Sequence, residues 1–323
     1  MRAVQAKEFG GPEVLVSVEL PDPVPGPGEV VIDVAYVDTI FVETQVRAGW
    51  GRDWFQVTPP YVPGGGVSGV VGALGTGVPA EWLGRRVTSL VSDGYAERAV
   101  APVSALTVVP DSVDLLTAAA LVHDGLTAAG LLEVTSVGPT DRVLILGASG
   151  GMGTLLVQLA HERGARVVAV ARGDAKLSLV RDLGADAVVD ATRGDWVAAA
   201  RRVLGGTVEG ADVVLDGVGG DLGAAALPLT ADGGRFSAHG AASGGFSPLD
   251  TEEAARRGIE VFGIGDIQFA PADLRRFTST AHSEAAAGRL RPVIGEVFAL
   301  ERAGDAHTAV EGRGLVGKVV LKV

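Results

Sequence analysis

The chain has 323 residues, of which 47% are hydrophobic and 20% charged, and its formal net charge is −12 at pH 7. Such a composition is globular and the length exceeds one ordinary domain, while the acidic charge argues against a nucleic-acid binder, which would carry a basic stripe. The chain contains no cysteine, which excludes disulfides, thiolate nucleophiles and cysteine-ligated zinc together.

Residues 1–10 contain no apolar run of the kind that forms the core of a secretory signal peptide. The most apolar stretch, residues 115–134, is interrupted by His123, Asp124 and Gly125, so we do not expect it to span a membrane. The absence of cysteine fits a reducing compartment. These features predict a cytoplasmic protein.

Residues 1–120 have the pattern of β-strands separated by turns. The turns are rich in glycine and proline, as in PDPVPGPGE at residues 21–29. Short valine-rich runs occupy residues 30–37, 69–74, 86–91, 98–101 and 106–109. We expect a barrel-like or sandwich module with few helices.

Helix formers dominate residues 111–134, where Asp111 or Ser112 is a candidate N-cap. From residue 142 onward, apolar runs alternate with helical segments that begin near residues 151, 174 and 195. The runs occupy residues 142–147, 166–171, 186–190, 211–217, 234–240 and 259–264. Continuously apolar strands are typical of a parallel sheet with helices on both faces, so the six runs predict an α/β, doubly wound sheet. The tail, residues 266–323, predicts helix and then a short strand, GKVVLKV, that rejoins the first module.

The stretch Gly147-Ala148-Ser149-Gly150-Gly151-Met152-Gly153 lies between a predicted strand and a predicted helix. Small residues there permit a tight turn and the close approach of a pyrophosphate, and the amide groups at the helix start attract the phosphates. A lone glycine motif is weak, and a flexible turn is the alternative. In this strand–turn–helix context the motif predicts a dinucleotide site.

The end of the second strand of this region indicates which dinucleotide binds. An NAD site normally has an acidic residue there, whereas this chain has Ala171 followed by Arg172, with Lys176 four residues later. A guanidinium can grip a 2′-phosphate that a carboxylate would repel, which favours NADPH over NADH. In the alternative interpretation Arg172 is a surface residue and Asp174 reaches the ribose.

At this point the sequence resembles a known family, the medium-chain dehydrogenases/reductases, and specifically the zinc-free NADPH:quinone oxidoreductase (zeta-crystallin-like) branch. The matching segments run the full length: MRAVQAKEFGGPEVL, PDPVPGPGEVVIDV, YVPGGGVSGVVGALGTGV, LGRRVTSLVSDGYAERAV, GLTAAGLL, LGASGGMG, RDLGADAVVD, LDGVGG and GLVGKVVLKV. The resemblance implies a GroES-like β-rich catalytic domain over 1–121, a Rossmann NADPH-binding domain over 122–265 and a C-terminal segment over 266–323 that completes the first domain. It also implies a cleft between the domains and a homodimer that pairs the final Rossmann strands near 259–264.

The resemblance further implies a set of cofactor-binding residues. The pyrophosphate loop would be Ser149, Gly150, Gly151 and Met152, and Arg172 with Lys176 would hold the adenosine phosphate. The ribose and nicotinamide would lie against Thr127 and against the backbone of Gly217, Val218, His239, Gly240, Phe262, Gly263 and Ile264.

The chain departs from the family pattern in three places. Ile40 stands where quinone reductases often carry an asparagine that polarises substrate or cofactor. Ala191 replaces a usual tyrosine, with Arg193 nearby as a substitute phosphate contact, and the loop WGRDWFQVTPP at 50–60 is rich in bulky aromatic residues. We expect a flat apolar substrate pocket of Ile40, Phe41, Trp50 and Trp54, with His123; core packing of these side chains is the alternative.

The histidines show no close pair with ligand spacing, so we expect no catalytic zinc. A quinone or enone can accept hydride without a Lewis acid, and no dominant acid or base is then expected. Candidate proton donors are His123, Tyr36 and Tyr61, although a helix-terminal His123 bonded to backbone is the more ordinary interpretation. The remaining histidines that we expect on helix surfaces are His161, His282 and His307.

The sequence therefore predicts an NADPH-dependent reductase of quinones or α,β-unsaturated carbonyls, acting on a small-molecule acceptor without nucleic acid or membrane. An enoyl-thioester reductase is the rival enzyme, although no basic cluster for a carrier phosphate is evident. An NADPH-binding sensor or a crystallin-like structural protein with little turnover is the rival of another class.

Overall fold

The computed structural model describes residues 1–205 and 210–323. The chain forms two compact units: the first comprises Met1–Leu126 and Pro271–Val323, and the second comprises Thr127–Ala270. Both divisions fall a few residues further along the chain than the sequence-based boundaries. The first division lies inside the helix α3, Asp124–Val134, so no turn or loop in the sequence marks it.

The first unit is built on a seven-stranded sheet with the order β14-β15-β3-β4-β5-β7, in which β6 also pairs with β3. A separate two-stranded sheet joins β1 and β2. The strands are β1 Arg2–Ala6, β2 Leu15–Glu19, β3 Glu29–Thr39, β4 Gly66–Leu74, β5 Arg86–Leu90, β6 Arg98–Pro102, β7 Thr107–Val108, β14 Ile294–Ala299 and β15 Lys318–Lys322. The predicted β-rich module is confirmed.

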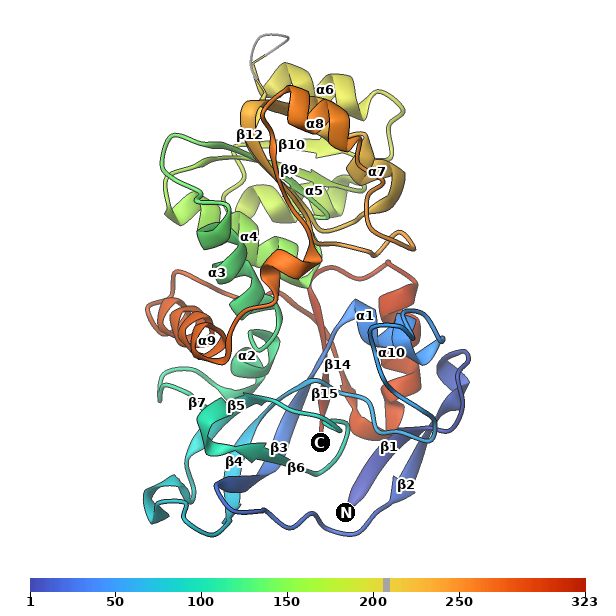
Figure 1. Cartoon of the computed structure of the whole chain (residues 1–323), viewed down its shortest axis with the longest axis vertical. Coiled ribbons are helices and arrows are strands. Elements are labelled where there is room, and N and C mark those ends of the chain that lie inside the picture. Colours follow the sequence, from blue (N-terminus) through green and yellow to red (C-terminus); the bar gives the residue numbers. More distant parts are fainter. Residues whose placement is uncertain (206–209) are drawn as a thin grey trace. The chain divides into compact units, whose positions relative to one another are not determined.

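The C-terminal strand β15 pairs antiparallel with β3, with Val319 opposite Thr39 and Leu321 opposite Val37. The tail therefore rejoins the first module, as its sequence predicts (Figure 1). On its other side β15 pairs in parallel with β14, a strand that the sequence patterns did not predict.

The helices of the first unit differ from the expected pattern. Two helices, α2 (Leu115–Ala120) and α3, replace the single helical stretch expected over 111–134. The N-cap of α2 is Asp114, whose carboxylate accepts from the Thr117 amide at 2.8 Å, so the prediction of Asp111 or Ser112 is wrong. The remaining helices are α1 Phe41–Arg47, α9 Pro271–Ala286 and α10 Ala303–Glu311, with the 3-10 turns η1 Pro12–Val14, η2 Ala80–Trp82, η3 Val103–Ala105 and η6 Leu300–Arg302.

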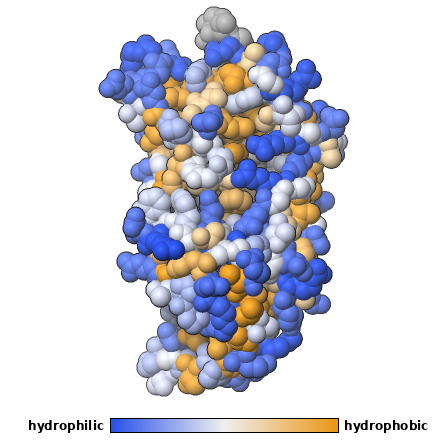
Figure 2. Space-filling view, turned by 90° about the vertical axis from the view of Figure 1, so that its right-hand side faces the viewer, coloured by the Kyte–Doolittle hydropathy of each residue, from blue (hydrophilic) through white to orange (hydrophobic). Residues whose placement is uncertain are grey.

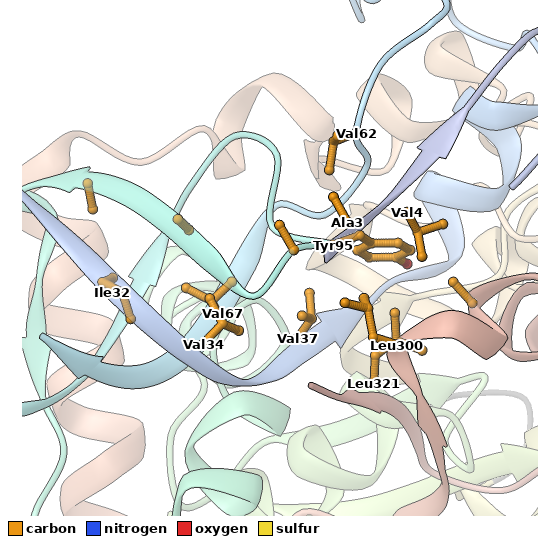
Figure 3. Packing of buried hydrophobic residues seen from close by; sticks show 14 of the residues in the cluster. Ala3, Val4, Ile32, Val34, Val37, Val62, Val67, Tyr95, Leu300 and Leu321 are labelled. Atoms are coloured by element: carbon orange, nitrogen blue, oxygen red, sulfur yellow. The ribbon is translucent and has the colours of Figure 1, made fainter. Parts of the chain in front are cut away.

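Apolar residues from both parts of the chain form the core of the first unit. Figure 3 shows Ala3 and Val4 beside the Tyr95 ring, and Val37 near Leu300 and Leu321. Every one of these side chains is nearly or completely buried. The core holds the C-terminal segment to the N-terminal strands because burial of apolar area is the main stabilising term.

The second unit contains the predicted parallel sheet (Figure 1). Its six strands have the order β10-β9-β8-β11-β12-β13, that of a doubly wound dinucleotide-binding sheet. They are β8 Arg142–Leu146, β9 Arg166–Ala171, β10 Ala187–Asp190, β11 Ala211–Asp216, β12 Thr230–Ala238 and β13 Glu260–Phe262. All six overlap the predicted apolar runs, although β12 begins at Thr230 and not at residue 234.

Helices surround this sheet because its strands are apolar on both faces. The helices of the unit are α4 Gly151–Glu162, α5 Asp174–Asp182, α6 Trp196–Val203, α7 Gly220–Ala224 and α8 Thr251–Arg256, with η4 Leu227–Leu229 and η5 Ile264–Ile267. Among the described residues no helix is long and apolar enough to cross a bilayer. On the face drawn in Figure 2, apolar side chains are interspersed with polar ones.

Candidate cofactor and active site

The glycine-rich loop joins β8 to α4 at the carboxyl end of the central strands. Gly147 has φ +69°, a left-handed conformation that glycine adopts without strain, and the chain turns there. Gly150 is the N-cap of α4 and has no side-chain cap, so the first amides of the helix are free to bind an anion.

Two glycines of this loop have different roles. A Cβ on Gly153 would lie 2.3 Å from the Gly147 carbonyl oxygen, so the helix packs on the turn only because residue 153 lacks a side chain. A Cβ on Gly150 would meet nothing nearer than 3.4 Å, and the residue is exposed. The space over Gly150 is open, as a pyrophosphate requires.

Two cations follow the second strand of the sheet. Arg172 comes directly after β9 and is exposed, and Lys176 lies in the first turns of α5. Burial lowers the pKa of Lys176, and the nearby charge of Arg172 lowers it further. Two neighbouring like charges favour a bound anion between them. Arg193, the suggested additional phosphate contact, is exposed, and its Nε lies 3.4 Å from Oδ1 of Asp195.

The ends of β11 and β12 approach each other closely. The Asp216 carbonyl accepts from the amides of His239 at 3.2 Å and of Gly240 at 2.9 Å. The buried Asp216 carboxylate accepts from the amides of Val218 and Gly219, both at 2.9 Å. A Cβ on Gly240 would lie 2.0 Å from the carbonyl carbon of Gly217. These contacts hold the two loops together at the edge of the sheet where such folds bind dinucleotides.

His239 presents an unpartnered nitrogen in this region. Its Nδ1 lies 3.1 Å from the Ser237 hydroxyl, whereas its buried Nε2 has no hydrogen-bond partner among the described residues. Burial lowers the pKa of His239 to about 4, so the ring is neutral at pH 7. A buried nitrogen without a partner is costly unless a ligand supplies one, so this edge fits a nicotinamide dinucleotide.

The other predicted cofactor residues are placed as follows. Thr127 lies in α3, partly buried, at the start of the second unit. Phe262 ends β13, and the Gly263 amide donates to Asp266 at 2.7 Å where η5 begins. Ser149 is buried, and Gly151 and Met152 begin α4. The structure thus brings the loop residues and the residues after β11 and β12 to one end of the sheet.

The predicted substrate residues fall into two groups. Ile40 and Phe41 stand at the start of α1, and the Phe41 ring lies 5.8 Å from the Arg313 guanidinium. Trp50 contacts Trp54 with ring centroids 5.5 Å apart, although Trp54 is 67% exposed. None of the four is fully buried, which argues against core packing as their main role.

His123 lies in a polar cluster inside the first unit. Its Nδ1 is 2.8 Å from Oδ2 of Asp38, and its backbone amide donates to the same oxygen at 3.0 Å. Asp38 is completely buried at the end of β3, and the Lys318 ammonium of β15 contacts both Asp38 and Asp124. His123 is therefore bonded to a carboxylate and not to a backbone carbonyl.

A second chain of polar groups adjoins this cluster. Glu43 accepts from the Ile40 and Gly65 amides at 3.1 and 3.0 Å, and from the Tyr95 hydroxyl at 3.0 Å. The Tyr95 oxygen lies 2.9 Å from Nε2 of His307, whose Nδ1 is 3.3 Å from the guanidinium of Arg47. Burial raises the pKa of Glu43, which favours its protonated form.

The expectation that His282 and His307 are surface residues is wrong, whereas His161 is exposed. Both buried rings are neutral, because burial lowers the pKa of His282 to about 4 and that of His307 to about 3. Sequence patterns did not indicate Asp38, Glu43, Tyr95 and Lys318 because these residues come from three distant segments of the chain. The one available signal was a charged lysine inside the apolar run GKVVLKV.

Many dehydrogenases hold a catalytic zinc ion with cysteine and histidine side chains. Within residues 1–205 and 210–323, no group of three or more histidine, aspartate or glutamate side chains is arranged to hold a metal. The sequence also supplies no cysteine ligand. The described residues therefore offer no set of ligands that fits a zinc ion.

Comparison with known proteins agrees with the fold. The family model described as alcohol dehydrogenase GroES-like domain matches residues 26–111, and that described as zinc-binding dehydrogenase matches residues 151–279. A mycobacterial protein solved in complex with NADPH superposes with a TM-score of 0.92, is 33% identical and covers 100% of both chains.

Two curated relatives align over nearly the whole chain. Quinone oxidoreductase of Mus musculus is 30% identical over 327 residues, covering 99% of this chain and 97% of the relative. 2-Haloacrylate reductase of a Burkholderia species is 31% identical over 330 residues, covering 99% and 98%. Identity at this level over full length establishes common ancestry and fold. The chain therefore belongs to the quinone oxidoreductase branch of the medium-chain dehydrogenase/reductase superfamily.

Proposed function

We propose that the protein uses NADPH to reduce a quinone or an α,β-unsaturated carbonyl compound without zinc. The observation that carries the proposal is the open glycine loop at the carboxyl edge of the parallel sheet, with two neighbouring cations after the second strand. Bound NADPH supplies a hydride to the acceptor. The protein's own contribution is to hold cofactor and acceptor in register and to exclude water.

The residues of the glycine loop and the two cations after β9 are suited to binding NADPH. Ser149, Gly150 and the first amides of α4 would hold the pyrophosphate, and Arg172 with Lys176 would hold the 2′-phosphate. His239 would offer its free Nε2 to the nicotinamide end. The mycobacterial relative, with which the chain shares its whole fold, was solved with NADPH.

The acceptor class follows from chemistry and from the relatives. One curated relative is named for quinones and another for 2-haloacrylate, an electron-poor alkene conjugated to a carboxyl group. Both acceptors delocalise the incoming electron pair onto oxygen, so neither needs a metal ion to activate it. The apolar Ile40 beside Phe41 suits the flat faces of such molecules.

Steady-state oxidation of NADPH with a panel of acceptors tests this function. We expect turnover with quinones or enones that dialysis against EDTA leaves unchanged. Turnover with acyl thioesters alone would favour the enoyl-thioester reductase. Binding of NADPH without reduction of any acceptor would favour the sensor or structural protein.

We also propose a homodimer in the cytoplasm, formed through β13. This strand lies at one edge of the six-stranded sheet; Val261 within it is 37% exposed and Ile264 just after it is 42% exposed. An unpaired apolar edge strand is suited to pairing with a second copy. Light scattering after size exclusion should give twice the chain mass, and a monomer at micromolar concentration would contradict the proposal.

A further inference from the structure

We propose that His123 donates the proton that completes reduction of the acceptor, and that Asp38, Lys318 and Asp124 position it. This inference depends on the proposed function above, and it differs from the sequence-based expectation of no dominant acid. Its basis is a buried and charge-balanced arrangement in which one imidazole nitrogen is fixed and the other is free.

The hydrogen bonds of His123 determine which nitrogen can react. The Asp38 carboxylate accepts hydrogen bonds from Nδ1 of His123 at 2.8 Å and from the backbone amide of His123 at 3.0 Å. Nδ1 therefore carries a proton in either charge state. Nε2 has no partner among the residues that the structure describes, and the side chain is 23% exposed, so this nitrogen is available to a ligand.

The charges around the ring favour its protonated form. Asp38 and Asp124 are two carboxylates, and the single buried ammonium of Lys318 contacts both. One further positive charge balances the cluster, and the imidazolium of His123 supplies it. Burial opposes that charge, but the hydrogen bond and the negative charge of Asp38 outweigh it and raise the pKa of His123.

The ring lies beside the residues predicted to contact the acceptor. A Cβ on Gly65 would be 3.1 Å from Cε1 and Nε2 of His123, so the imidazole packs against bare backbone. The Gly65 amide donates to Glu43, the same carboxylate that accepts from the Ile40 amide. His123 and Ile40 thus flank one buried carboxylate at the start of α1.

Other candidate donors are less suited to the step. Burial raises the pKa of Tyr61 to about 12, which makes it a weak acid at neutral pH. The Tyr95 hydroxyl is buried between Glu43 and His307 and does not reach solvent. Among these groups, His123 alone combines partial exposure with an ordinary pKa close to the neutral range, which its surroundings raise.

The proposed step balances as follows. Hydride adds to the β-carbon of an enone, and the electron pair of the C=C bond moves through the conjugated system onto the carbonyl oxygen. The Nε2–H bond of His123 breaks and its proton goes to that oxygen, giving a neutral enol and a neutral imidazole. The enol then tautomerises to the saturated carbonyl, and the imidazole regains a proton from water.

The central test compares His123→Gln with His161→Gln, a matched change at an exposed histidine of α4. We expect His123→Gln to lower kcat for an enone by about 10²-fold, the usual contribution of a general acid. The fall of wild-type kcat at high pH should disappear in this variant. Reduction of a quinone should fall less, because a hydroquinone anion is a weaker base than an enolate. His161→Gln should match the wild type.

Two further measurements do not depend on turnover. The NADPH dissociation constant of His123→Gln should stay within about twofold of wild type. In NMR spectra the imidazole signal of His123 is the one that disappears in His123→Gln. In the wild type this signal should titrate above the ordinary histidine pKa of about 6.5. Titration below that value would overturn the proposal.

Asp38→Asn tests the positioning residue. It should lower the NMR pKa of His123 and shift the kcat profile to lower pH, with KM little changed; a thermal melt checks that it folds. If Asp38→Asn does not fold, the NMR titration of His123 in the wild type still tests whether the ring is protonated more readily than an ordinary histidine. Enone turnover by His123→Gln equal to wild type would overturn the proton-donor role alone. A wild-type protein that reduces no quinone or enone would overturn the proposed function and this step with it.

Discussion

At the scale of single residues, the glycine loop gives the most specific prediction about cofactor binding. Gly150→Val should abolish NADPH binding in a folded protein, because its side chain would occupy the open space that the pyrophosphate needs. NADPH fluorescence titration measures the effect. Gly314→Val is the control, since a Cβ at Gly314 also meets nothing within 4 Å but lies in the first unit. Normal affinity in Gly150→Val would contradict the loop assignment.

Arg172 decides between the two dinucleotides. Arg172→Ala should weaken NADPH about 10- to 100-fold, the usual contribution of a charge-assisted hydrogen bond, and should leave NADH nearly unchanged. Calorimetric titration with both cofactors is the measurement, and Arg181→Ala, an exposed change later in α5, is the control. Equal weakening of NADPH and NADH would favour the alternative in which Asp174 contacts the ribose.

The buried histidine of α9 predicts a pH dependence of stability. His282 is 1% exposed and burial lowers its pKa to about 4, below the value of about 6.5 in the unfolded chain. The unfolded state therefore binds the extra proton between these values, and stability falls as pH drops below about 6.5. His282→Leu should remove part of that fall, roughly 1–2 kcal/mol at pH 5. Urea unfolding at pH 5 and pH 8 tests this, and an unchanged pH dependence would contradict it.

At the scale of elements, local patterns predicted most of the fold. Apolar runs such as 142–147 and 211–217 predicted the parallel strands because the centre of each strand is buried on both faces and consists of Val, Leu and Ile. The helix α1 was missed because its segment is short and rich in β-branched residues, which favour strands. At its start Glu43 accepts a hydrogen bond from the Ile40 amide. The Asp38–His123–Lys318 cluster could not be predicted from local patterns, because strand pairing brings its members together.

The start of α2 offers a direct test at this scale. Asp114→Ala should cost about 1 kcal/mol, because the variant loses the carboxylate that caps the Thr117 amide. Asp111→Ala, at the position that the sequence favoured, should cost much less since Asp111 is exposed and caps no helix. Chemical denaturation of both variants compares them, and equal losses would show that the cap is not the stabilising feature.

At the scale of the whole molecule, the two units differ in how the chain builds them. The second unit is one continuous segment with its own apolar core. A fragment spanning residues 122–270, which keeps all of α3, should fold cooperatively and bind NADPH. Thermal unfolding by circular dichroism and NADPH fluorescence test the fragment. A disordered fragment would show that the second unit needs the rest of the chain.

The pairing of β15 with β3 has a consequence for synthesis of the protein. A ribosome makes β3 early, but its partner strand is among the last residues to emerge. The edge of β3 over residues 36–39 therefore stays unpaired until translation ends, while the continuous second unit can already be complete. Nascent chains stalled shortly before residue 318 should then engage chaperones through the first unit, and release of the full chain should end that engagement.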